Sequence, residues 1–227
     1  MNGVAAGLPA RSETWPMYRS MVGIGLLCGL LLVGAFQITK PIIERNQAEA
    51  LARAIFQVLP EAASSKTFAL GDDGRFTILE GQPVGQTIVY GGYDATGRLV
   101  GVAVEAAGMG YQDTIRLLYG YSAENDAIAG IQVLDSKETP GLGDKIQFDP
   151  EFLANFARLD VTLAEDGSRL AHDIVSVRHG QKTEAWQIDA ITGATVSSNA
   201  IANILNKSAT RFVPAIRAHL DDFRETE

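Results

Sequence analysis

The sequence predicts an α+β fold, in which a single N-terminal apolar helix precedes one domain with a mainly antiparallel sheet and flanking helices. The N-terminal part contains a long apolar run free of charge, and strand-like runs separated by turn residues fill the middle of the chain. Near the C-terminus the apolar positions recur at helical spacing. With 227 residues, the chain has room for one ordinary domain and an appendage.

The apolar run, residues 21–38, is long enough to span a bilayer. We therefore expect a short tail over residues 1–20 and a transmembrane anchor over residues 21–39. A cleaved signal peptide is the alternative, since Arg19 precedes the run and residues 33–35 resemble a cleavage site. We favour the anchor because the run is long for a signal peptide. Basic residues on the two sides nearly balance, so charge does not decide the orientation.

Residues 40–60 are expected to form an amphipathic linker helix. Apolar side chains at Ile43, Leu51 and Ile55 recur at helical spacing, opposite a charged face. Pro60 should end this helix.

The remaining residues, 61–227, are predicted to form the folded domain. Residues 61–85 are rich in Ser, Asp and Gly, and we expect a loop with short strands there. Further on, strand-like runs alternate with turn residues at the spacing of hairpins, which favours an antiparallel sheet. A glycine-rich loop is expected at residues 108–113. We expect strands at residues 86–90, 99–106, 115–121, 128–134, 174–177 and 186–188.

Two helices complete the predicted domain. Asp149 is a plausible N-cap for a short helix with Pro150 at its first position. A longer helix should begin near Ser197, and Pro214 should end or kink it before a final amphipathic piece at residues 216–223. The apolar face of the longer helix is formed by Ile201, Ile204, Leu205, Ala209 and Phe212.

Composition excludes several classes of function. The net charge of −8, without a run of basic residues, argues against nucleic-acid binding. One cysteine, Cys28, excludes a disulfide, an iron–sulfur cluster or a thiolate zinc site formed by this chain alone. His172, His179 and His219 lack ligand spacing, so no metal site is expected. We find no nucleophile–base pair, so any redox chemistry would need an organic cofactor.

Two segments are candidates for binding such a cofactor. Residues 189–198 read DAITGATVSS and place hydroxyls and free N–H groups at a helix start, which favours a phosphate. A simple helix cap is the alternative. Residues 138–145 read ETPGLGDK, where Pro140 predicts a tight turn, and Gly141 and Gly143 allow the backbone to approach a flat ligand. A plain hairpin turn is equally compatible with that spacing.

The first segment closely resembles the Asp-x-x-(Ser/Thr)-Gly-Ala-Thr motif of FMN-binding-domain proteins. In that family a flavin transferase joins FMN, through a phosphoester, to the threonine of the motif. The second segment is similar to an upstream motif of the same family. With the N-terminal anchor, the chain resembles the G subunit of the Rnf electron-transport complex, a membrane assembly that exchanges electrons between NADH and ferredoxin and couples this to ion movement. A related alternative is the C subunit of the sodium-pumping NADH:quinone reductase.

The resemblance implies a redox subunit without an active site of its own, which carries covalent FMN on Thr195 in an FMN-binding domain over residues 61–227. The ester phosphate would meet the amides of residues 196–198. Implied partners are the other Rnf subunits, a flavin transferase during maturation and the lipid bilayer. The chain would cross the bacterial inner membrane once, with its domain on the periplasmic side. Two alternatives remain, a stand-alone membrane-anchored FMN sensor and a purely structural domain. Residues implied to hold the cofactor are Thr195, Thr192, Gly193, Ala194, Val196, Ser197, Glu138, Thr139, Gly141, Leu142, Gly143 and Lys145.

Overall fold

The computed structural model of the chain describes residues 14–71, 73–79 and 86–224. Most of the expected N-terminal tail, part of the loop expected before residue 86 and the last three residues therefore lie outside the described residues. The chain divides into two compact units, residues 1–49 and residues 50–227.

The first unit is described by one element, helix α1 (Thr14–Val58), whose last turns belong to the second unit. Its N-terminal part contains a window long and apolar enough to cross a membrane, judged by length and composition. The helix runs through Pro41, although a proline has no N–H group to donate to the preceding turn. The segments expected as anchor and as linker are thus continuous in secondary structure, and the helix ends just before Pro60.

The second unit is built on an antiparallel sheet, which confirms the predicted fold class. In the described residues its strand order is β2-β1-β3-β4-β5-β6-β7, with every neighbouring pair antiparallel. Each strand expected between residues 86 and 134 is present, within three residues of its predicted ends. The strands are β1 (Ser64–Leu70), β2 (Phe76–Ile78), β3 (Thr87–Tyr93), β4 (Leu99–Met109), β5 (Thr114–Ser122), β6 (Ala127–Asp135) and β7 (Leu159–Asp160).

One face of the sheet packs against residues 54–59, at and just beyond the end of α1. Val58 and Leu59 are buried there with Tyr90 and Leu118. Gly120 permits this approach, because a Cβ at that position would lie 2.2 Å from the carbonyl oxygen of Val58. The glycine in the middle of β5 therefore reflects helix-on-sheet packing.

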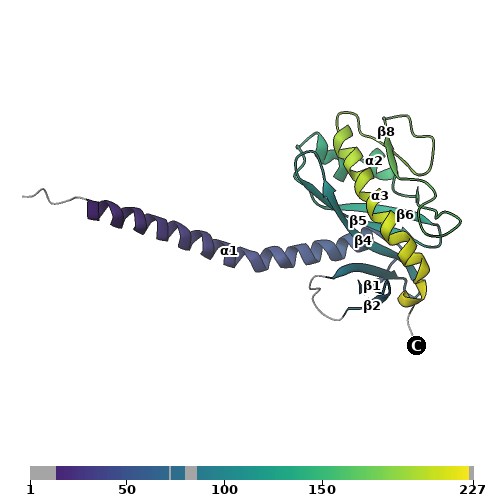
Figure 1. Ribbon diagram of the computed structural model, residues 1–227, viewed down its shortest axis with the longest axis horizontal. Helices are drawn as coiled ribbons and strands as arrows, with labels where there is room; N and C mark the ends of the chain where they lie inside the picture. The colour runs from purple at the N-terminus through teal and green to yellow at the C-terminus, as the bar shows by residue number, and fades with distance from the viewer. Residues whose placement is uncertain (1–13, 72, 80–85, 225–227) are drawn as a thin grey trace, which may run out of the picture. The chain divides into compact units, whose positions relative to one another are not determined.

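The opposite face is covered by helix α3 (Thr195–Ala218), which lies across the strands in Figure 1. Of the two outcomes expected at Pro214, an end of the helix is wrong, since α3 continues to Ala218 before a 3₁₀ turn, η2 (Leu220–Phe223). Phe212 and Val213 before the proline and Ile216 after it are all buried in the main core. Burial on both sides of Pro214 outweighs the one backbone hydrogen bond that it removes.

The chain between the sheet and α3 supplies shorter elements. A 3₁₀ helix, η1 (Gly143–Gln147), leads to α2 (Pro150–Ala154), whose predicted N-cap is confirmed because the Asp149 side chain accepts the N–H groups of Glu151 and Phe152. The last two predicted strands are present as β8 (Val175–Val177) and β9 (Gln187–Asp189), and they pair in parallel. Strand β9 leads directly into the segment that precedes α3.

Candidate cofactor-binding groove

The start of α3 leaves backbone donors free. Ala194 occupies the N-cap position and makes no side-chain capping bond, and α3 begins at Thr195, two residues earlier than expected. In the described part of the chain, no acceptor contacts the N–H groups of Thr195, Val196 or Ser197, whereas the Ser198 N–H donates to the Ala194 carbonyl (2.9 Å). The free amides are therefore residues 195–197, and they form an anion-binding helix terminus.

Ser198 stabilises the turn in front of the helix. Its buried hydroxyl accepts the Ile191 N–H (3.1 Å) and donates to the Ala194 carbonyl (3.0 Å). Gly193 adopts a φ of +85°, which favours glycine in this turn. The Ser198 hydroxyl thus holds the turn and leaves the first α3 amides uncapped.

A groove of about 360 Å³ lies beside this helix start and brings the two predicted segments together. Exposed apolar side chains line part of it, with Tyr111 67%, Leu142 53% and Val196 54% exposed. Tyr111, from the β4–β5 turn, was absent from the predicted residues, because nothing in the local sequence indicates that this turn meets the α3 start. The lining residues are Tyr111, Glu138, Thr139, Leu142, Gly143, Gly193, Ala194, Thr195, Val196 and Ser197.

Glu138 connects the walls of this groove. Its carboxylate is 5% exposed, and Oε1 accepts the N–H groups of Tyr111 (2.8 Å) and Gln112 (3.0 Å). The Ser197 hydroxyl donates to Oε2. One side chain thereby joins the β4–β5 turn, the segment after β6 and the first turn of α3.

The glycines near Glu138 have a packing role. A Cβ on Gly143 would lie 2.6 Å from Glu138 Oε2 and 2.7 Å from Ser197 Oγ, and a Cβ on Gly110 would lie 2.5 Å from Glu138 Oε1. Gly143 is therefore required by the close approach of the buried Glu138 carboxylate and the Ser197 hydroxyl. Gly141, with φ +77°, shapes the predicted tight turn, in which the Leu142 N–H donates to the Thr139 carbonyl.

Three predicted residues do not line this groove. Gly141 is one of them, and Thr192 and Lys145 line a second hollow of about 210 Å³. Apart from these two, the second hollow is lined by Asp149, Glu151, Phe152, His179, Asp189, Ala190 and Ile191.

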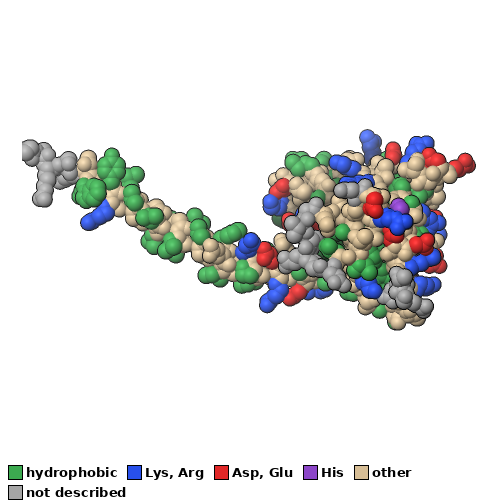
Figure 2. All heavy atoms as spheres, turned by 60° about the horizontal axis from the view of Figure 1, so that its bottom comes forward, with side chains coloured by type: hydrophobic (Ala, Val, Ile, Leu, Met, Phe, Trp, Pro, Cys, Tyr) green, Lys and Arg blue, Asp and Glu red, His purple; other side chains and the backbone are tan. Residues whose placement is uncertain are grey.

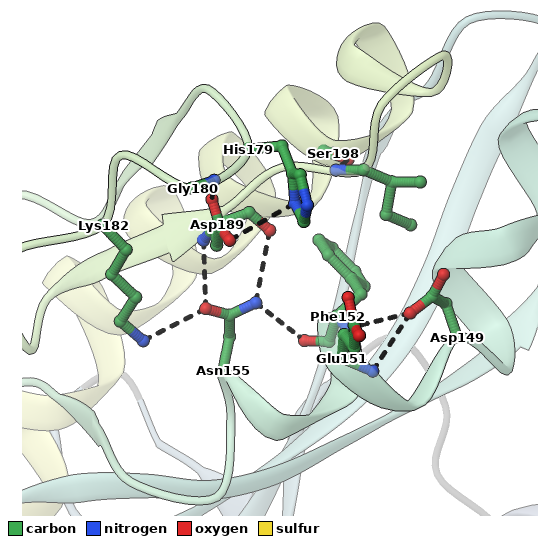
Figure 3. Close-up of polar contacts among 10 residues, drawn as sticks. Asp149, Glu151, Phe152, Asn155, His179, Gly180, Lys182, Asp189 and Ser198 are labelled. Atoms are coloured by element: carbon green, nitrogen blue, oxygen red, sulfur yellow. Dashed lines mark hydrogen bonds and ion pairs between the residues drawn. The ribbon is translucent and has the colours of Figure 1, made fainter.

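Beside the second hollow, Asn155 fixes the start of the segment that contains Thr195 (Figure 3). Its buried carboxamide accepts the Asp189 N–H (3.0 Å) and donates to the Asp189 carbonyl (3.2 Å). The same group donates to the Phe152 carbonyl and accepts from Lys182 Nζ, whose pKa is lowered by burial. Sequence reasoning missed Asn155, because Asp189, with which it makes two hydrogen bonds, lies 34 residues away.

The Asp189 carboxylate is also engaged within the domain. It accepts the Gly180 N–H (2.7 Å), and its second oxygen lies 3.4 Å from His179 Nδ1 (Figure 3). In the view of Figure 2, acidic and basic side chains are interspersed over the domain, whereas hydrophobic side chains extend along α1.

Comparison with known proteins identifies the family. Residues 110–210 match the model of the FMN-binding domain, a range that includes both candidate segments. The chain is 34% identical over 202 residues to the G subunit of the ion-translocating oxidoreductase complex of Methanosarcina acetivorans, covering 86% of this chain and 92% of the relative. The chain belongs to the family of G subunits of ion-translocating oxidoreductase complexes.

The chain is also similar to a second G subunit and to a solved C subunit. The chain is 28% identical to the G subunit of the Na⁺-translocating ferredoxin:NAD⁺ oxidoreductase complex of Acetobacterium woodii, covering 80% of this chain and 82% of the relative. The crystal structure of the C subunit of Na⁺-translocating NADH-quinone reductase from Parabacteroides distasonis superposes with a TM-score of 0.57 at 16% identity, over 81% of this chain and 96% of that one. This likeness shows a shared fold.

Proposed function

We propose that this protein carries electrons within an ion-translocating NADH:ferredoxin oxidoreductase complex of the Rnf type, using FMN attached through a phosphoester to Thr195. One observation carries the proposal. Thr195 is the exposed first residue of a helix whose N-terminal amides have no acceptor in the described residues, beside a groove that contains both family segments. An ester phosphate on Thr195 Oγ would supply the anion that this helix start lacks.

The groove fits the remainder of the cofactor. Its volume of about 360 Å³ lies in the usual range of roughly 300–1,000 Å³ for ligand pockets. Leu142, Val196 and Tyr111 offer apolar contact for a flat ring, and Thr139 offers a hydroxyl. Bound FMN would supply the capacity to accept and donate electrons. Because the groove is open, the ring edge would stay accessible to redox partners.

The chain's own residues then have distinct roles. Thr195 retains the cofactor, and its β-branched side chain restricts the direction of the ester oxygen. The amides of Thr195, Val196 and Ser197 bind the phosphate, while Ala194 and Gly193 shape the turn beside it. Residues 138, 139, 142 and 143 form the facing wall, and Gly141 maintains its turn. Thr192 and Lys145 line the second hollow, so we assign them no contact with the ring.

We further propose that α1 anchors the protein in the bacterial inner membrane, with residues 21–39 spanning the bilayer, residues 40–60 forming the linker and the domain from residue 61 on the periplasmic side. The apolar window of α1 supports this proposal. The other subunits of the complex and a flavin transferase would be its partners. N-terminal sequencing of the protein extracted from membranes should find residues 21–39 retained, whereas a mature protein that begins after residue 35 would indicate a signal peptide.

The deciding experiment is intact-mass analysis of the full chain, produced with a flavin transferase and denatured before measurement. We expect the added mass of esterified FMN in the wild type and its loss in Thr195→Ala. Thr210→Ala is the matched control, because it removes an exposed threonine hydroxyl of α3 that lies outside the motif and the groove, and it should keep the flavin. Covalent flavin that persists in Thr195→Ala would overturn the assignment of the acceptor.

A further inference from the structure

Glu138 places a buried charge at the groove. Its carboxylate is 5% exposed and lines the same hollow as Thr195. Its partners in the described residues are neutral donors, namely two backbone N–H groups and the Ser197 hydroxyl. An ionised carboxylate only accepts hydrogen bonds, so three donors suit its charged form.

Neutral donors orient this carboxylate without cancelling its net charge. Burial also reduces the screening by water, so the charge acts more strongly on its surroundings than an exposed carboxylate would. Glu138 therefore contributes a negative electrostatic potential to the groove. Hydrogen bonds to the β4–β5 turn and to α3 hold its carboxylate in place.

We propose that Glu138 lowers the reduction potential of the flavin held in this groove, an inference that rests on the proposed function. An electron passed from a reductant to the ring adds one negative charge there until a proton from water compensates it. A fixed negative charge nearby makes that addition less favourable, and charge near the ring is one of the means by which proteins tune a flavin. The free amides of α3 act in the opposite direction, but they are common to every variant below and cancel from the comparison.

Glu138→Gln is the direct test. The carboxamide oxygen keeps an acceptor for the Tyr111 and Gln112 amides, and its NH₂ group replaces the hydrogen bond with Ser197 by donating to the hydroxyl. The charge is lost while the connections remain. The midpoint potential of the full-length, flavin-loaded protein would be measured by dithionite titration with redox mediators, following flavin absorbance. We expect a shift to a more positive potential than in the wild type.

Glu124→Gln is the matched control. Glu124 is an exposed carboxylate between β5 and β6 and does not line the groove, so the same loss of charge there should leave the potential unchanged. A Glu138→Gln protein that carries flavin at the wild-type potential would overturn the inference. A wild-type protein without covalent flavin would contradict the proposed function instead.

If the Glu138→Gln protein does not load flavin, a second pair of variants tests the same inference. Glu138→Asp and Glu138→Asn both shorten the side chain by one methylene, and only the asparagine removes the charge. The midpoint potential of Glu138→Asn should lie above that of Glu138→Asp. Equal potentials in this pair would overturn the inference, because a purely structural role depends on length and packing and not on charge.

Discussion

The two ends of the segment from Asp189 to Ser198 differ in how their hydrogen bonds are satisfied. At its start, the Asn155 carboxamide engages both the N–H and the carbonyl of Asp189, and the Asp189 carboxylate is itself engaged. At its end, Thr195 and the following two residues present free N–H groups beside the groove. The start is a fixed support, and the end is a site prepared for an anion.

This difference indicates how one short segment serves both stability and binding. Ordering a flexible turn costs about 1–2 kcal/mol per residue in conformational entropy. Here the hydrogen bonds of Asn155 and Ser198 order the turn when the protein folds, so a ligand at Thr195 would not have to order it on binding. The free donors of Thr195 and Val196 cost little without a ligand, because both residues are exposed and water can reach them.

The largest effect that would sharpen this comparison is expected from Asn155→Ala. The change leaves the Asp189 N–H and the carbonyls of Asp189 and Phe152 without their buried partner, so we expect a loss of about 2–4 kcal/mol in the free energy of unfolding. Urea denaturation followed by circular dichroism would measure it. Asn203→Ala, at an exposed position of α3, is the control and should change stability by less than about 0.5 kcal/mol.

Thr195→Ala tests the binding end of the segment, as Asn155→Ala tests its supporting start. Thr195 is exposed, so its removal should leave the stability of the flavin-free protein within about 0.5 kcal/mol of the wild type. If Thr195→Ala destabilised the flavin-free protein as much as Asn155→Ala, the distinction between a supporting start and a binding end would fail.

A smaller effect is expected from Ser198→Ala, which acts between the two ends. The Ile191 N–H would lose its buried acceptor and the Ala194 carbonyl one donor, for a cost of about 1–3 kcal/mol. Thr192→Ala, at an exposed position of the same turn, should be nearly neutral. A mobile turn should also load flavin more slowly, which a time course of intact mass with transferase would measure. Wild-type loading by a destabilised Ser198→Ala protein would show that turn rigidity is unimportant.

Much of the fold could be predicted, because strands between residues 86 and 134 are short apolar runs bounded by turn residues, and these signals are local. The Asp149 cap was predictable for the same reason. The parallel pairing of β8 with β9 was not, because strand direction depends on how the intervening loop returns. The apolar character of Phe212 and Ile216 was visible in the sequence, but not that both are buried in one core by a helix that continues past Pro214.

The site was predictable in its composition and less so in its geometry. The two candidate segments were found by their motifs, and the structure places most of their residues around one groove. The connection between Glu138 and Ser197 spans 59 positions, and neither residue has a local signal for it. Lys145 belongs to the second hollow because η1 turns the chain after Gly143, a change of direction that spacing alone cannot convey.

The smallest effect is expected at Asp113, which pairs with Lys137 across the same two segments that Glu138 joins. The hydrogen bond from Lys137 holds the pKa of the Asp113 carboxyl below its ordinary value of 3.8. Folding therefore favours the ionised form, and this stabilisation is present above pH 3.8 and is lost as the pH falls through the lower folded-state pKa. Melting temperatures of wild type and Asp113→Asn should differ slightly near neutral pH and converge in acid. Because the pair is exposed, added salt should shrink the difference as well. A difference that persists in acid and in high salt would contradict a role for the ion pair with Lys137, because asparagine keeps an oxygen that can accept the Thr114 N–H.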